Sequence, residues 1–194
     1  MKHCTRLGAG IAATLATTLA ANFASSASAD VTITLTNQSF TGLSFMEAIN
    51  YAAGANLVGT LTGASINVTL DSSVSYTYAD DLCLYIDQGE FSTEGLLQIG
   101  GYSDLEASER HIWPNGASDA PGTTAIGTVT LESALQFTGD RLVDGTIWIG
   151  NGYGADATLG TWTGTVTLHG VNAIPTPGAM ALLGLIGLTR RARR

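Results

Sequence analysis

The chain has 194 residues, of which 45% are hydrophobic and only 12% are charged, and its formal net charge is −8. The scarcity of Lys and Arg excludes a basic nucleic-acid-binding protein, because such proteins need cations to displace counterions from phosphates. The high apolar content excludes a highly charged disordered chain. All 16 acidic residues and only two Arg fall within residues 30–173, which contain no Lys.

Residues 1–29 have the organisation of a secretory signal peptide. Two basic residues come first, and a mostly apolar stretch follows them. Ala27 and Ala29 then supply the small side chains that signal peptidase requires just before its cut. We therefore predict cleavage before Asp30 and export of the remaining chain. The alternative is an uncleaved membrane anchor.

Residues 30–173 carry the pattern of one all-β domain. Apolar and polar residues alternate in short segments rich in Thr and Val, as in antiparallel strands with one buried face. The expected strands comprise residues 31–35, 66–70, 74–78, 82–86, 96–99, 128–131, 146–149 and 162–168. Residues 43–53 are the one stretch compatible with a helix. We expect an antiparallel β-sandwich or jelly roll, flanked by an N-terminal signal helix and a short C-terminal apolar helix.

Asp80 and Asp81 form the first candidate for a calcium site. Calcium takes six to eight oxygen ligands from carboxylates and loop carbonyls, and this acidic pair precedes an expected strand. No EF-hand spacing or Gly-rich calcium repeat is present, so a solvated acidic loop is the alternative interpretation. His and Cys are too few to favour zinc, and no other cofactor is expected.

Nucleophilic catalysis has little support in the sequence. Cys83 lies on the opposite face of its expected strand from Leu82 and Leu84, which favours a small packed apolar role. After signal removal it is the only Cys, so no intramolecular disulfide can form. His169 ends the last expected strand, where we predict a hydrogen-bonded surface residue. No Gly-x-Ser-x-Gly motif occurs, and we predict that the protein is not an enzyme.

Three aromatic residues are candidates for ligand binding. Tyr102, Trp113 and Tyr153 fall in expected loops, where exposed rings can stack on sugar rings. The alternative is that they cover one end of the hydrophobic core. Trp148 and Trp162 alternate within expected strands and are assigned to the core.

Residues 174–194 form a second targeting segment with a Pro-x-Pro motif, an apolar run of ten residues and an Arg-rich end. The run is shorter than the ~20 residues of a stable membrane span, and the Arg side chains would stay on the cytoplasmic side. The defining residues are Pro175, Thr176, Pro177, Gly178, Arg190, Arg191, Arg193 and Arg194.

This tripartite segment resembles the PEP-CTERM sorting signal of exported bacterial proteins, with Thr176 at the position where that motif has Glu. The resemblance implies a transient inner-membrane tether and processing by an exosortase, a membrane-embedded cysteine protease. A plain tail anchor is the alternative. Within the body, residues 80–86 and 160–162 resemble an early and a closing strand of the P-domain jelly roll found beside secreted bacterial proteases. That second resemblance implies a fold and no function.

Together these features predict a non-enzymatic exported protein that is structural or adhesive in the bacterial cell envelope or extracellular matrix. Its expected processing partners are signal peptidase and an exosortase-type protease. A carbohydrate-binding module, with or without calcium and with exopolysaccharide as its partner, is the first alternative. A secreted hydrolase is the second. The acidic body favours solubility and disfavours polyanionic partners such as nucleic acid.

Overall fold

The computed structural model describes residues 30–49, 55–88, 91–102, 104–140 and 144–175. The predicted signal peptide, with Ala27 and Ala29, lies outside these ranges. So do the sorting residues that follow Pro175, namely Thr176, Pro177, Gly178, Arg190, Arg191, Arg193 and Arg194. Within the described ranges, no helix is long and apolar enough to span a membrane.

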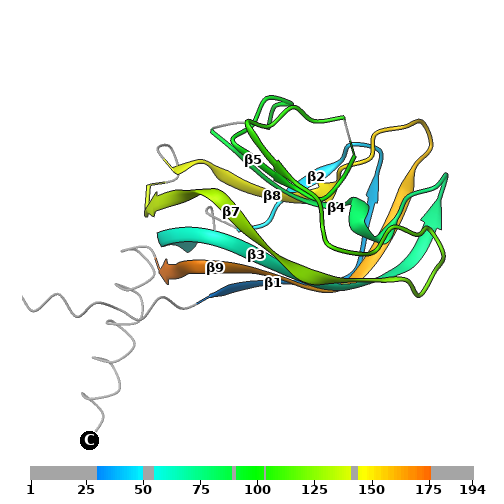
Figure 1. The fold of residues 1–194 in the computed structure, drawn as a ribbon, viewed down its shortest axis with the longest axis horizontal. Helices are drawn as coiled ribbons and strands as arrows, with labels where there is room; N and C mark the ends of the chain where they lie inside the picture. Colours follow the sequence, from blue (N-terminus) through cyan, green and yellow to red (C-terminus); the bar gives the residue numbers. More distant parts are fainter. Residues whose placement is uncertain (1–29, 50–54, 89–90, 103, 141–143, 176–194) are drawn as a thin grey trace, which may run out of the picture.

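The described residues form nine strands in two sheets, which Figure 1 shows as two facing layers. The first sheet has the order β1-β9-β3-β7, with β1 (Val31–Thr41), β9 (Leu159–Pro175), β3 (Ala55–Val74) and β7 (Thr124–Thr138). The second has the order β2-β8-β4-β5-β6, with β2 (Phe45–Glu47), β8 (Thr146–Asn151), β4 (Leu82–Asp87), β5 (Leu97–Ile99) and β6 (Glu109–His111). Only the pair β5–β6 is parallel. The predicted all-β class is confirmed.

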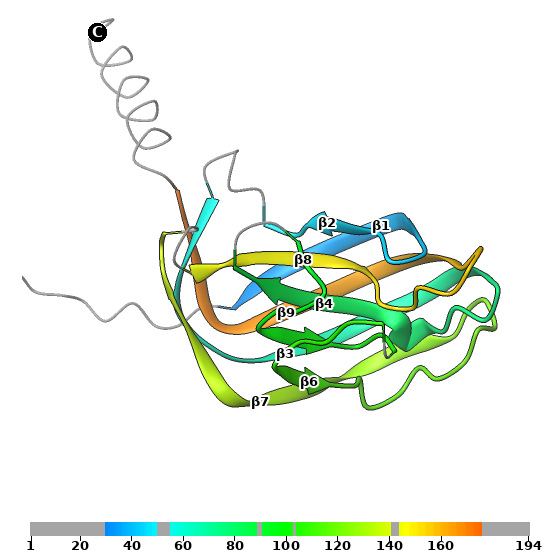
Figure 2. The same cartoon turned by 90° about the horizontal axis from the view of Figure 1, so that it is seen from above.

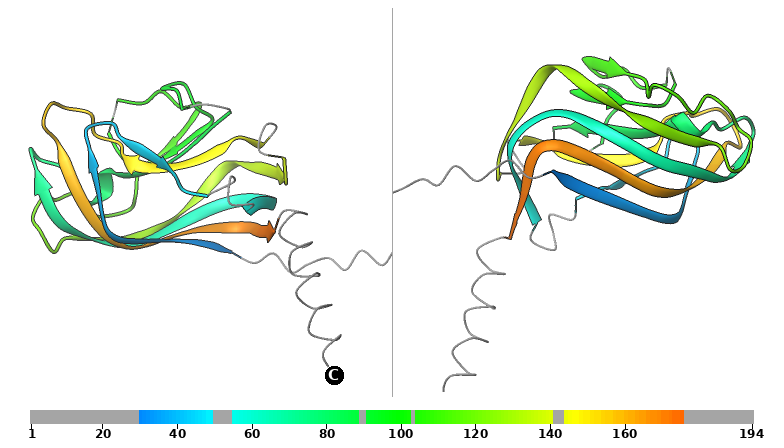
Figure 3. Two further views of the ribbon diagram at one scale, coloured as in Figure 1. Left: turned by 180° about the vertical axis from the view of Figure 1, so that it is seen from behind. Right: turned by 60° about the horizontal axis from the view of Figure 1, so that its bottom comes forward.

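The two sheets enclose a common hydrophobic core. Along β3, Ile66, Val68 and Leu70 are buried, whereas the intervening Asn67 points outward. This alternation follows from the pleat, which sends successive side chains to opposite faces. Trp162 of β9 is fully buried in the same core, as its position in the pattern predicts. Figure 3 shows the long strands of the first sheet running side by side.

A smaller cluster lies on the other face of β4. Cys83 and Tyr85 are fully buried there, and Trp148 packs against them while partly buried. Leu82 and Leu84 belong instead to the main core, so the predicted facing of Cys83 is confirmed. Burial raises the pKa of the Cys83 thiol well above its ordinary value, which suppresses the nucleophilic thiolate.

One expected strand is wrong. Residues 74–78 alternate in sequence, but β3 ends at Val74 and the chain turns at once. Ser75 and Tyr76 both have left-handed backbones, with φ of 56° and 61°. Two consecutive left-handed residues turn the chain instead of extending the pleat, so the alternating side chains do not share one sheet face.

Two other segments differ from expectation. The described part of residues 43–53 holds the short strand β2 rather than a helix, because Phe45 pairs with Gly150 of β8 and stacks on Phe91. At the other end, β9 continues to Pro175, two residues into the predicted sorting segment.

Candidate ligand-binding cleft

Three loops meet at one end of the two layers, around the short 3-10 turn η2 (Ala79–Asp81) that precedes β4 (Figure 2). The carbonyl oxygen of Asp80 accepts a hydrogen bond from the Gly101 N–H at 3.0 Å, and that of Asp81 accepts one from the Gly152 N–H at 2.8 Å. The Tyr102 N–H donates to the Gly152 carbonyl at 3.0 Å. The loops that follow β3, β5 and β8 are therefore fixed to one another by backbone hydrogen bonds.

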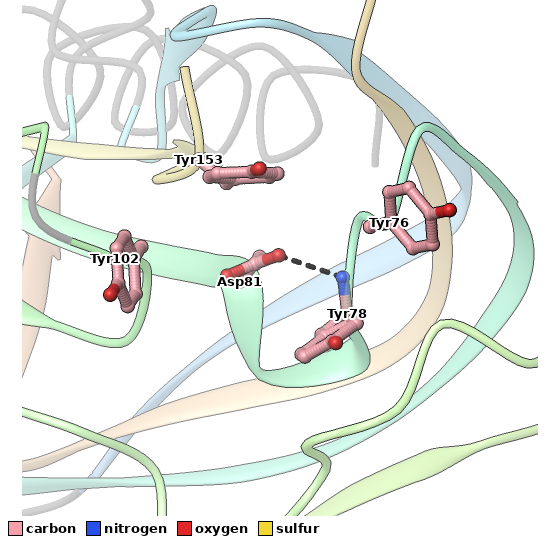
Figure 4. Close-up of a pocket in the computed structure, with 5 residues that line it drawn as sticks. All are labelled: Tyr76, Tyr78, Asp81, Tyr102 and Tyr153. Carbon is pink, nitrogen blue, oxygen red and sulfur yellow. Dashed lines mark hydrogen bonds between the residues drawn. The ribbon is translucent and has the colours of Figure 1, made fainter. Parts of the chain in front are cut away.

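These loops surround a cleft of about 280 Å³, which we call the tyrosine cleft. It is lined by Tyr76, Tyr78, Asp81, Tyr102 and Tyr153. Figure 4 shows the Asp81 carboxyl group lying between the tyrosine rings. Tyr76 and Tyr102 are 73% and 66% exposed. Exposed aromatic rings gathered around one hollow are typical of a binding site rather than of an ordinary protein surface.

The turn that carries Tyr76 is strained and is held closed by side chains. A left-handed backbone costs a residue other than Gly roughly 1–2 kcal/mol, and both Ser75 and Tyr76 adopt it. The Ser73 hydroxyl donates to the Thr77 carbonyl at 2.7 Å, and the Thr77 hydroxyl donates to the Val74 carbonyl at 3.0 Å. Such strain concentrates at functional sites, where the surroundings hold the chain in place.

A polar network fixes the backbone of Tyr102. Its carbonyl oxygen accepts hydrogen bonds from Gln98 Nε2 at 3.1 Å and from Arg110 Nη2 at 2.8 Å. Arg110 Nε also donates to Gln98 Oε1 at 3.0 Å, and Gln98 is buried. Arg110 is the only Lys or Arg within the described ranges, and its guanidinium group serves to hold this loop.

Tyr153 enters the cleft from the loop after β8. Its N–H donates to Asn151 Oδ1 and its carbonyl accepts from the Thr158 hydroxyl, both at 3.0 Å. Its ring meets that of Tyr102 edge-on, with centroids 6.2 Å apart and planes at 87°, a favoured aromatic geometry. The structure thus brings together two of the three aromatic residues that the sequence singles out.

Trp113, the third aromatic candidate, does not reach the cleft. Its side chain is 2% exposed and packs in the main core, and its Nε1 donates to the Leu82 carbonyl at 2.7 Å. An indole can be buried in this way because its one polar atom has a partner. The expectation of an exposed ring is therefore wrong for Trp113, which covers the core instead.

Asp81 is the charged group of the cleft. Its Oδ2 accepts a hydrogen bond from the Tyr78 N–H at 2.7 Å. Burial, followed by the negative charges of Asp80 and Asp104, nevertheless raises the pKa of Asp81 to about 6. Burial also raises the pKa of Asp80, whose Oδ1 is buried without a hydrogen-bond partner among the described residues.

Calcium at Asp80 and Asp81 stays a prediction. No group of three or more His, Cys, Asp or Glu side chains that could share a metal ion occurs in the part of the chain that the structure describes. A calcium ion at this pair would have to draw most of its six to eight oxygen ligands from backbone carbonyls, water or a bound ligand.

Sequence reasoning missed Tyr76 and Tyr78. Their alternation around Thr77 is typical of a strand, and neither Ser75 nor Tyr76 belongs to the residue types that favour a left-handed turn. The acidic pair just after them is the one signal that marks this segment as a chain reversal.

A second polar group lies on the outer face of the first sheet. His169 Nε2 lies 2.6 Å from the Ser65 hydroxyl oxygen, and His169 Nδ1 lies 2.8 Å from Asp30 Oδ2. The hydrogen bond to His169 holds the pKa of Asp30 below its ordinary value. The prediction of a hydrogen-bonded His169 at the surface is confirmed. The order Ser, His, Asp is also that of a serine-hydrolase triad.

No protein-family model matches this chain, and no curated protein or solved structure matches it either. Its structural class is therefore defined by the fold and the cleft alone. It is an all-β protein of two sheets that carries an aromatic, acid-bearing cleft on the loops at one end.

We expect Asp81→Asn to stabilise the protein at neutral pH. Because the folded pKa of about 6 exceeds the ordinary value of 3.8, the folded state binds more protons between these values. Stability contributed by Asp81 is therefore lost as the pH rises through this window. At pH values above the folded pKa, the full shift corresponds to a loss of up to about 3 kcal/mol in the free energy of unfolding. Asn removes this penalty and can still accept the Tyr78 hydrogen bond.

The measurement is urea unfolding of both proteins across this pH window and at neutral pH. The difference between the two free energies of unfolding should grow as the pH rises and level off above the folded pKa. Asp156→Asn, at an exposed position in the loop after β8, is the matched control and should leave the profile unchanged. Parallel profiles for the wild type and Asp81→Asn would contradict the assignment.

Proposed function

We propose that this protein is a non-enzymatic adhesive protein, exported to the bacterial cell surface or extracellular matrix, that binds carbohydrate through the tyrosine cleft. The observation that carries this proposal is the gathering of four tyrosine rings around one carboxyl group. Sugars present apolar C–H faces to aromatic rings and hydroxyl groups to phenols and carboxylates. An exopolysaccharide of the matrix is the corresponding partner.

The fold is proposed to be a β-sandwich of the jelly-roll class. Its support is the strand order, which is β1-β9-β3-β7 in one sheet and, with β6 set aside, β2-β8-β4-β5 in the other. Two Greek keys folded onto each other produce this order. Most connections then cross between the layers at their ends, where the loops can build a binding site.

Export and sorting are proposed from the two terminal segments. Residues 1–29 have the organisation that signal peptidase recognises, and residues 174–194 resemble a PEP-CTERM signal. The processing partners are then signal peptidase and an exosortase, with a transient inner-membrane tether between the two steps. The Lys-free acidic body fits this location and disfavours nucleic acid as a partner.

Export predicts a defined amino terminus. The protein recovered outside a producing bacterium should begin at Asp30, as measured by mass spectrometry of its amino-terminal peptide. Replacing Ala27 and Ala29 with Leu should block the cut, because signal peptidase accepts only small residues at these positions. Ala21→Leu, within the apolar stretch, is the control and should be processed normally. A mature chain that begins elsewhere would contradict the predicted signal.

Carbohydrate binding is tested on a glycan array, followed by titration with the best-bound glycan. Tyr102→Ala and Tyr153→Ala should each weaken binding roughly fivefold, since a lost ring contact is worth about 1 kcal/mol. Ile112→Ala removes a side chain that is 76% exposed outside the cleft, and it should bind like the wild type. Repeating the titration with EDTA tests the calcium-assisted form, in which affinity and melting temperature both fall.

Two results would overturn the binding proposal. One is an array without any bound glycan. The other is unchanged affinity in both Tyr variants while their melting temperatures match the wild type, because the sugar would then bind away from the tyrosine cleft.

A secreted serine hydrolase is the second candidate function, favoured by the Ser65–His169–Asp30 hydrogen bonds. In such a reaction the Ser65 oxygen attacks an ester carbonyl while His169 takes its proton and passes it to the departing alcohol. Water then cleaves the acyl-serine. We rank it second because Ser65 pairs with Thr128 and Thr167 on both sides, which engages its backbone N–H in the sheet. An oxyanion hole needs free donors beside the nucleophile.

A fluorophosphonate probe distinguishes these two functions. An active serine attacks phosphorus and releases fluoride, so a hydrolase would be labelled at Ser65, as read by peptide mass spectrometry. Ser65→Ala and His169→Gln would then abolish the label. Ser39→Ala, on the same sheet face but paired with Thr161 instead of a His, would retain it. We expect no labelling, and labelling at Ser65 would replace the binding proposal as the primary function.

A further inference from the structure

The charged side chains at the tyrosine cleft are acidic among the residues that the structure describes. Asp81 lines the cleft, and its pKa is raised mainly by burial and further by the negative charges of Asp80 and Asp104. Within the described ranges, Asp81 forms no salt bridge. Arg110 is engaged by Gln98 and the Tyr102 carbonyl. The residues that the structure describes therefore place a buried acid in the cleft without supplying a cation to match it.

Burying the Asp81 carboxylate in this way costs free energy. A buried carboxylate is stable only when hydrogen bonds or an opposite charge replace its lost water. Asp81 Oδ2 receives one hydrogen bond from Tyr78, and Figure 4 shows the other carboxyl oxygen on the side of Tyr102. A ligand that brings a positive charge to this oxygen would supply the opposite charge that the described residues do not provide.

The tyrosine rings favour the same kind of ligand. The face of a tyrosine ring attracts a cation electrostatically, and cages of aromatic rings are a general device for holding alkylammonium groups. Four rings lie around Asp81, and those of Tyr102 and Tyr153 stand edge to face. A neutral sugar would stack on these rings and could donate a hydroxyl hydrogen bond to Asp81, but it would leave the negative charge of the carboxylate without an opposite charge.

We infer that the tyrosine cleft binds a polysaccharide containing amino sugars with free, protonated amino groups, the ammonium group lying against Asp81 among the tyrosine rings. This inference rests on the carbohydrate-binding function proposed above and names its ligand class. A lysine side chain carries the same ammonium group on a thin flexible stem. The cleft of about 280 Å³ is wide enough for a sugar ring, and its phenol groups match a ligand rich in hydroxyls.

The experiment compares two matched tetrasaccharides by calorimetric titration of the exported protein at low ionic strength and slightly acidic pH. One is the β-1,4-linked glucosamine tetramer, and the other is its N-acetylated counterpart, which differs only in having neutral amides. We expect the free-amine tetramer to bind at least tenfold more tightly. The preference should shrink as salt is added, because screening weakens the ion pair.

Asp81→Asn is the decisive variant. It should remove the preference for the free amine, so that the two tetramers bind the variant with similar affinity. Asp156→Asn takes one charge from an exposed position in the loop after β8, and it should keep the preference. A preference that survives in Asp81→Asn would come from the overall negative charge and would overturn the inference.

The remaining outcomes distinguish the amino-sugar inference from the carbohydrate-binding function on which it rests. Equal binding of the two tetramers, or of neutral glycans alone on the array, overturns the amino-sugar inference and leaves carbohydrate binding standing. Failure of every glycan to bind overturns both. Tighter binding of a lysine-rich peptide than of the glucosamine tetramer replaces the polysaccharide with a protein partner.

Discussion

Four consecutive carbonyl groups, from Ala79 to Leu82, hold the end of this protein together. They accept, in order, the Trp162 indole N–H, the Gly101 and Gly152 amides and the Trp113 indole N–H. The two indoles anchor the segment in the hydrophobic core, and the two amides tie the other loops to it. One short segment therefore ties the loops of the tyrosine cleft to the hydrophobic core.

Much of this architecture could be predicted from alternation along the chain. The pattern correctly places Trp162 in the core and separates the facing of Cys83 from that of its neighbours. It also selects Tyr102 and Tyr153 as loop residues. The same reasoning fails for Tyr76, because alternation reports a strand only while the backbone stays extended. It fails for Trp113, because a loop position says nothing about whether a large ring folds back onto the core.

The tyrosine cleft departs from the local pairing seen at another buried acid of the molecule. Asp144 accepts four hydrogen bonds, from the Thr138 hydroxyl and three backbone amides. Asp81 receives one and lies among other acids. Asp81 thus lies where exposed rings and a left-handed turn occur together, which is the pattern that motivates the proposed binding function.

The length of β9 has a mechanical consequence. This strand begins at Leu159, near the tyrosine cleft, and ends at Pro175, where the predicted tether starts, and its length along the chain is roughly 55 Å at the rise of a β-strand. It pairs with β1 on one side and β3 on the other. A pull between a bound polymer and the cell would act along these ladders, so many hydrogen bonds would have to shear together instead of opening one by one.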